Sequence, residues 1–129
     1  METWTNDELT KIGTAEELQI RSLRRDGSLR NPVTVWVIRL DKGLYVRSVN
    51  GRKGAWFRGT QVCHEGRILA GGIERAATFV EEANPAINDQ IDTAYRTKYR
   101  RYAISIVNSV LTSQARAATI KLVPRQTGA

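Results

Sequence analysis

Two short stretches of this chain, residues 23–30 and 47–54, combine basic, hydroxyl and glycine residues, and a tryptophan follows the second stretch. Guanidinium and ammonium groups bind phosphate oxygens, and a helix that begins behind a glycine-containing loop adds free backbone N–H groups. An aromatic ring can then cover a flat heterocycle attached to the phosphate. The pattern therefore predicts a site for a flat, phosphorylated ligand. The parts of the chain that could meet at this site are residues 23–30, residues 47–54 and Trp56-Phe57.

No pair of residues in the sequence is typical of acid–base or metal catalysis. Cys63 and His64 are neighbours on a predicted helix, so their side chains point apart. Glu81 and Glu82 alternate on a predicted strand and face opposite sides of it. With one cysteine and one histidine, a zinc site would need unusual carboxylate ligation. We predict neither a metal site nor a dedicated catalytic residue.

Several of these polar and aromatic residues also have a purely structural interpretation. Basic turns on small domains are commonly solvated, and Trp36 stands in an apolar stretch that is typical of a core strand. Asp89, Asp92 and Lys98 fall on the polar side of a predicted helix, where we expect solvated surface. The alternative is that Lys98 and the tyrosines of that helix form an edge of the site.

The composition excludes several classes of protein. The 129 residues carry 20 Lys and Arg against 13 Asp and Glu, a net charge of +7 that favours anionic ligands. No stretch approaches the roughly 20 apolar residues that a membrane-spanning helix needs. The start, residues 1–4, lacks the basic and apolar regions of a signal peptide. The single cysteine, Cys63, suits a reducing compartment, so we expect a cytoplasmic protein without a membrane partner.

The elements that must position the candidate residues predict a single α+β, mostly β domain over residues 1–129. Strands are predicted at 16–24, 32–40, 44–49, 67–73, 76–82 and 118–123. Helices are predicted at 6–11, 55–64 and 85–102, with 103–112 continuing or restarting the last one. Gly71-Gly72 indicates a bulge or a close backbone approach. After a short N-terminal helix in residues 1–15, we expect residues 16–125 to form a six-stranded antiparallel split β-barrel with peripheral helices.

Three motifs resemble the flavin-binding split β-barrel superfamily, which includes pyridoxamine-phosphate-oxidase-like proteins and deazaflavin-dependent nitroreductases. The latter carry a Gly-Arg-Lys-Ser/Thr-Gly turn, a Ser-x-Gly-Gly loop and a Trp-Tyr-x-Asn helix start. In the same order this chain has Leu23-Arg24-Arg25-Asp26-Gly27, Ser48-Val49-Asn50-Gly51 and Trp56-Phe57-Arg58-Gly59. It departs from the pattern at Leu23, Asn50 and Gly59.

The chain is more similar still to a small uncharacterised bacterial family within that superfamily, a domain of unknown function. The resemblance extends from about residue 16 to residue 125. The shared stretches are Arg25-Asp26-Gly27, Leu44-Tyr45-Val46-Arg47-Ser48, Ala70-Gly71-Gly72, Ala94-Tyr95-Arg96-x-Lys98-Tyr99 and Leu122-Val123-Pro124-Arg125.

The resemblance implies a homodimer that holds FMN or a deazaflavin coenzyme between its subunits, with hydride transfer performed by the cofactor. It implies that Arg24 and Arg25 bind the phosphate, that Ser48, Asn50 and Gly51 form the tail-binding loop and that Trp56 lies against the site. Lys53 is added for its charge and position. The three departures leave open a cofactor-free structural or interaction domain. The positive charge leaves open a nucleic-acid-binding module, against which the small number of aromatic residues argues.

Overall fold

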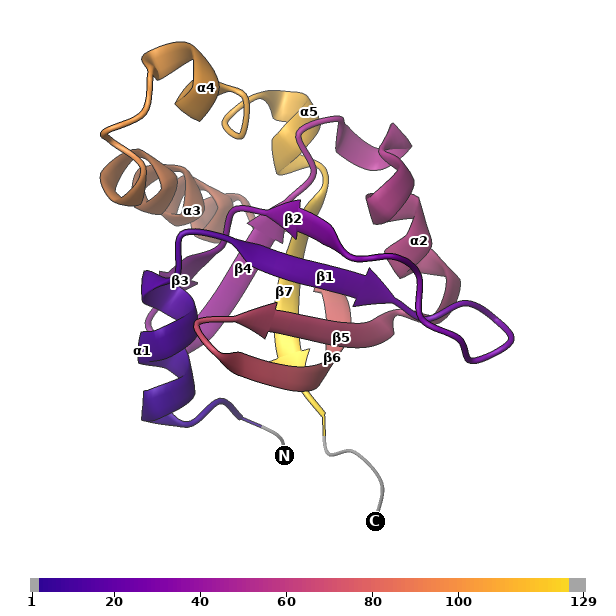
Figure 1. Cartoon of the computed structure of the whole chain (residues 1–129). Helices are drawn as coiled ribbons and strands as arrows, with labels where there is room; N and C mark the ends of the chain where they lie inside the picture. Colours follow the sequence, from indigo (N-terminus) through magenta and orange to yellow (C-terminus); the bar gives the residue numbers. More distant parts are fainter. Residues whose placement is uncertain (1–2, 126–129) are drawn as a thin grey trace.

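The computed structural model of the chain describes residues 3–125, and its centre is one antiparallel sheet of seven strands (Figure 1). The strands follow the order β2-β1-β5-β6-β7-β4-β3. Their bounds are β1 Leu18–Ser22, β2 Val33–Val35, β3 Ile38–Leu40, β4 Gly43–Arg47, β5 Glu65–Ala70, β6 Ile73–Glu81 and β7 Thr119–Pro124. The two outermost strands, β2 and β3, are consecutive in the chain. The sheet therefore curls into a split barrel, as the sequence predicts.

The count of seven strands, rather than the predicted six, arises from a break in the stretch 32–40. Val33–Val35 pairs with β1, whereas Ile38–Leu40 pairs with β4 at the other end of the sheet. Between them the backbone of Val37 bonds to side chains instead of to a strand. Its N–H donates to the hydroxyl of Tyr99 at 3.2 Å, and its carbonyl accepts from Lys98 at 2.6 Å. The predicted strand thus bends at Val37, where the side chains of Lys98 and Tyr99 take the place of the hydrogen bonds to a neighbouring strand.

Two tight turns join neighbouring strands. Asp41, at φ 51°, begins a two-residue turn between β3 and β4. Gly71 and Gly72, both at positive φ, make the turn between β5 and β6. A Cβ atom on Gly71 would lie 2.2 Å from the carbonyl oxygen of Lys11. The sequence predicts either a bulge or a close backbone approach at this glycine pair. The structure shows the close approach, and the two glycines form a tight turn rather than a bulge.

Five α-helices and a short 3₁₀ helix surround the sheet in the described part of the chain. Their bounds are α1 Asn6–Thr14, η1 Gly51–Lys53, α2 Ala55–Cys63, α3 Pro85–Lys98, α4 Ile104–Asn108 and α5 Ser113–Arg116. A capping box at Thr5 and the side chain of Asn84 start α1 and α3 where the sequence predicts. The helix predicted over 85–102 ends at Lys98, and α4 restarts after a turn. Within residues 3–125 no helix combines the length and apolar character that crossing a membrane requires.

Two hydrophobic cores hold these elements together. The first fills the barrel, with Leu44 and Val46 of β4 among its members. The second lies on the outer side of β3 and β4, beneath α3 and α4, and includes Tyr45, Tyr95 and Tyr99. Because side chains alternate along a strand, β4 is buried on both faces. The second core fixes α3 and α4 beside the sheet, where they shape the cavity described next.

Candidate functional site

A cavity of about 430 Å³ lies between β2, the start of α2 and α4. This volume falls within the usual range of small-molecule sites, roughly 300–1,000 Å³. Trp36 and Trp56 are its aromatic lining residues, and valines and Ile106 add apolar surface. The polar lining comes from Glu17, Thr34, Asn50, Arg47 and Ser109. The sequence-based site contributes Asn50 and Trp56 directly to this lining.

The two tryptophans are held in different ways. Trp36 stacks on Tyr99, with ring centroids 3.9 Å apart and an interplanar angle of 5°. Trp36 is therefore only partly the core residue that its apolar stretch predicts, because it is half-buried between the second core and the cavity. Trp56, in the first turn of α2, is half-buried and meets Phe57 edge-on at 6.4 Å. One aromatic lining residue is thus rigidly supported and the other stands at the rim.

The loop from Ser48 to Gly54 leads into α2 and contains an unusual buried hydroxyl. Gly51, at φ +71°, and Gly54 donate backbone hydrogen bonds to Ser48 and Gly51 at 2.9 and 3.1 Å. Ser48 is 1% exposed, and its Oγ has no hydrogen-bond partner among the described residues. That Oγ lies only 2.6 Å from where a Cβ atom on Gly54 would stand. A buried polar group without a partner carries a free-energy cost, which a ligand group could remove.

Gly54 is also the N-cap residue of α2, and no side chain caps this end of the helix. The first backbone N–H groups of the helix lack intrahelical partners and carry partial positive charge. Lys53 is exposed on η1, one residue before the cap. The start of α2 therefore has free backbone donors, an ammonium group and the buried Ser48 hydroxyl close together along the chain, while Asn50 and Trp56 are the predicted residues that line the described cavity itself.

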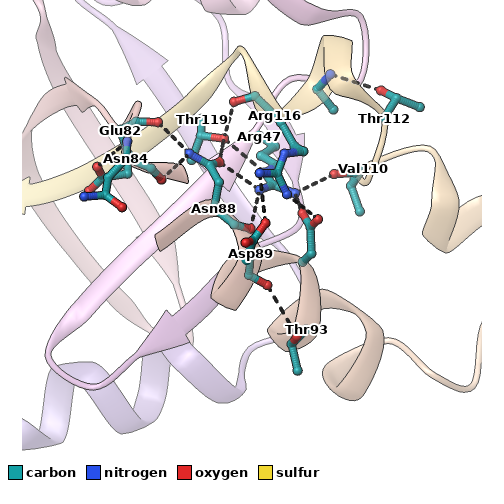
Figure 2. Close-up of polar contacts among 12 residues, drawn as sticks. Arg47, Glu82, Asn84, Asn88, Asp89, Thr93, Val110, Thr112, Arg116 and Thr119 are labelled. Carbon is teal, nitrogen blue, oxygen red and sulfur yellow. Dashed lines mark hydrogen bonds and ion pairs between the residues drawn. The ribbon is translucent and has the colours of Figure 1, made fainter. Parts of the chain in front are cut away.

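Arg47 belongs to the basic stretch in the sequence, yet its side chain is completely buried. Its Nε donates to Thr119 Oγ1 at 3.0 Å, and its two terminal nitrogens donate to Asp92, to the Val110 carbonyl and to both oxygens of Asn88 (Figure 2). These five acceptors match the five N–H donors of a guanidinium group. Although Arg47 lines the cavity, it has no donor left for a ligand.

Asp92 and Lys98 are not the solvated surface residues that the helical pattern predicts. Asp92 is 9% exposed and accepts from both Arg47 and Arg116, which joins α3 to β4 and α5. Lys98 is half-buried and bonds to two backbone carbonyls. Asp89 alone fits the prediction, since its side chain is 75% exposed beside Arg116. Asn88 and Asp92, four residues apart, share one side of α3, and this spacing was the available signal for a buried polar cluster.

Arg24 and Arg25 lie in the exposed loop between β1 and β2, at the far end of α2 from the Ser48–Gly54 loop (Figure 1). The Arg24 carbonyl contacts Cys63 Sγ, at the last residue of α2, at 3.6 Å. A nine-residue helix is about 13 Å long. Within one chain, the structure groups the 48–54 loop with Trp56 and leaves the two arginines apart from them.

The chain matches the model of a known protein family. The model of the family described as "Uncharacterized protein conserved in bacteria (DUF2255)" matches residues 8–122. A search among curated proteins found no match to the chain.

Solved structures share the fold. A putative pyridoxamine 5'-phosphate oxidase from Listeria innocua has a TM-score of 0.64 at 14% identity, covering 94% of this chain and 93% of its own. A conserved hypothetical protein from Mycobacterium tuberculosis has a TM-score of 0.58 at 12% identity, covering 98% and 83%. An F420 reductase has a TM-score of 0.54 at 13% identity, covering 93% of each chain. These similarities confirm the split-barrel fold.

Proposed function

This chain belongs to the bacterial DUF2255 family, and we propose that it binds a flavin-type cofactor, FMN or a deazaflavin coenzyme, in the cavity between Trp36 and Trp56. The observation that carries the proposal is the buried, unpartnered Ser48 hydroxyl beside the uncapped start of α2. Two structural neighbours, described as a pyridoxamine 5'-phosphate oxidase and an F420 reductase, support it through the shared fold.

The residues around the cavity fit such a ligand in two parts. A flat ring suits the space between Trp36 and Trp56, because aromatic faces stack favourably on planar heterocycles. A phosphate suits the start of α2, where Ser48, Lys53 and backbone N–H groups supply donors. Glu17 is the one carboxylate among the described residues of the cavity lining, and it disfavours an anion on its side. A bound flavin or deazaflavin would supply hydride transfer, and the chain's own residues would hold and orient it.

We further propose that the working form is a cytoplasmic homodimer in which Arg24 and Arg25 of one subunit hold the phosphate of the cofactor bound mainly by the other. Their distance from the 48–54 loop within one chain makes a second subunit necessary for this role. Large apolar side chains beside the cavity offer surface for such an interface: Val49, Ile104 and Ile106 are 46%, 78% and 48% exposed.

Titration of the purified protein with FMN and with a deazaflavin coenzyme, followed by cofactor fluorescence, tests the binding site. We expect saturable binding of one of them, weakened about tenfold or more by Trp56→Leu, since stacking on one aromatic ring contributes about 1–3 kcal/mol. Ser48→Ala is expected to weaken binding as well. Val80→Ala, which trims an exposed apolar residue on β6, is the matched control. Folded protein that binds neither cofactor would instead support a cofactor-free structural or interaction domain.

Mixed dimers test the contribution of the second subunit. The double variant R24Q/R25Q and the variant W56L should each bind the cofactor weakly on their own. In a mixture of the two, dimers with one chain of each kind have one complete site, formed by the arginines of one chain and Trp56 of the other. Recovery of tight binding to about a quarter of all sites supports the arrangement. Absence of any recovery, with dimers shown by sedimentation, contradicts it.

A further inference from the structure

A second cavity, of about 560 Å³, lies between α3 and β3 and shares no lining residue with the cavity of the two tryptophans. Its walls include Ile38 and Leu40 from β3 and Thr93 and Thr97 from α3. Two cationic side chains, Arg39 and Lys98, complete the lining, and no carboxylate is present among its described residues. The cavity is therefore electropositive as well as partly apolar.

The amine of Lys98 is held at a fixed place in this lining. Its Nζ donates to the carbonyl oxygens of Ala15 and Val37, each at 2.6 Å. A neutral amine has two N–H groups, so both bonds can persist after Lys98 loses its third proton. The lone pair then takes the remaining tetrahedral position, away from the two carbonyls. This geometry presents Lys98 as a positioned nucleophile without breaking its contacts.

Burial favours the neutral form of the Lys98 amine and lowers its pKa to about 8. The carboxylate of Glu16, which follows α1, has other partners than Lys98: it is paired with Arg101 and accepts a hydrogen bond from Tyr102.

The neighbouring phenol does not compete for the proton. The ring of Tyr99 lies 5.1 Å from Lys98 Nζ. Burial raises the pKa of the Tyr99 hydroxyl, and the negative charge of nearby Glu17 raises it further. Tyr99 therefore stays neutral across the physiological range.

With a pKa of about 8, about half of the molecules carry an uncharged Lys98 at pH 8, whereas an ordinary exposed lysine is almost fully protonated there.

We propose that Lys98 and Arg39 form a binding site for a small carbonyl compound that carries a carboxylate or phosphate group, which Lys98 holds as an imine. The Lys98 nitrogen forms a bond to the carbonyl carbon, and the resulting carbinolamine expels its oxygen as water together with both amine hydrogens. The imine nitrogen takes up one proton from solvent, so it keeps one N–H group and one of the two bonds to the carbonyl oxygens of Ala15 and Val37 is lost. Arg39 binds the anionic group. Its Nε donates to the Asp41 carbonyl at 2.7 Å, and it has no carboxylate partner among the described residues.

Reductive trapping of the full-length chain with glyoxylate and cyanoborohydride at pH 7.5 tests the site, with each modified lysine located by peptide mass spectrometry. We expect Lys98 to be carboxymethylated about tenfold faster than the exposed Lys11, Lys42 and Lys53, because its neutral fraction is far larger. A rate at Lys98 equal to those of the exposed lysines overturns the proposal.

A second comparison tests the role of Arg39. Arg39→Gln should slow trapping of glyoxylate at Lys98 severalfold while leaving trapping of neutral formaldehyde unchanged, and Arg39→Lys should restore the glyoxylate rate. Equal slowing of both aldehydes would show that Arg39 does not recognise the anion and would contradict the site. Thermal unfolding of each variant confirms that the comparison is between folded proteins.

Discussion

The ring of Trp36 stacks on the ring of Tyr99, with a centroid separation of 3.9 Å, and so joins an aromatic lining residue of the candidate cavity to the second core. Trp36 stands where the chain leaves β2 for β3, and Tyr99 bonds to the next residue, Val37. The same tyrosine therefore fixes both the bend in the strand and the orientation of the cavity lining.

Trp36→Leu is expected to lower the free energy of unfolding by about 2–3 kcal/mol, because it removes the stacking partner of Tyr99 and leaves a void. Urea denaturation measures this change. Trp56→Leu is the matched control, since that ring stands at the cavity rim, and it should cost less than half as much. Equal losses in the two variants would contradict a supporting role for the stack.

Arg47→Met should destabilise the protein by about 3–5 kcal/mol, because it leaves Asp92 with Arg116 as its remaining arginine partner and deprives four further buried acceptors of their donor. The control is Arg52→Met, which removes an exposed arginine paired with Glu81 and should produce no measurable change. Denaturant unfolding compares the two. A small loss of stability in Arg47→Met would mean that solvent reaches Asp92 and the other partners of Arg47.

Lys98 should make stability rise between pH 8 and about pH 10. Its pKa is lowered to about 8 in the folded chain from an ordinary 10.5, so in this window the unfolded state binds more protons, and raising the pH favours folding. Because Lys98 is only half-buried, we expect a gain of about 1–2 kcal/mol. Lys98→Gln keeps a hydrogen-bond donor without a titrating group. Urea unfolding across this range should show a flatter profile for that variant.

Gly71→Ala and Gly72→Ala form a matched pair at the β5–β6 turn. Both glycines have positive φ, where an L-residue costs about 1–2 kcal/mol. Only at Gly71 does the added Cβ collide with backbone, at 2.2 Å from the Lys11 carbonyl oxygen. We therefore expect G71A to lose about 2–4 kcal/mol and G72A about 1 kcal/mol. Thermal or urea unfolding orders the two, and a reversed order would be inconsistent with the packing of α1 on this turn.

Much of the fold follows from local sequence signals. The capping residues Thr5 and Asn84, the turn at residues 41–42 and the β-branched stretches place most helices and strands correctly, whereas the strand predicted over 67–73 runs through the turn that Gly71 and Gly72 make. The break at Trp36–Val37 could not be predicted in this way, because it depends on Lys98 and Tyr99, about 60 residues away.

The candidate site was predictable only in part. Ser48, Asn50 and Gly51 lie on a loop that leads directly into the helix carrying Trp56, so chain connectivity alone brings them near one another. Arg47 looked equally available, but its burial depends on acceptors contributed by residues 88, 92, 110 and 119. No local pattern reveals a partner set spread so widely along the chain.

The last strand of the chain, β7, lies in the middle of the sheet, between β6 and β4. A ribosome must therefore release residues 119–124 before β4 and β6 can be bridged, and until then each has an unpaired edge open to other chains. Loss of this segment by premature termination or proteolysis would leave two separate sheet fragments rather than a shortened barrel. We expect such a product to aggregate in the cell through its unpaired strand edges.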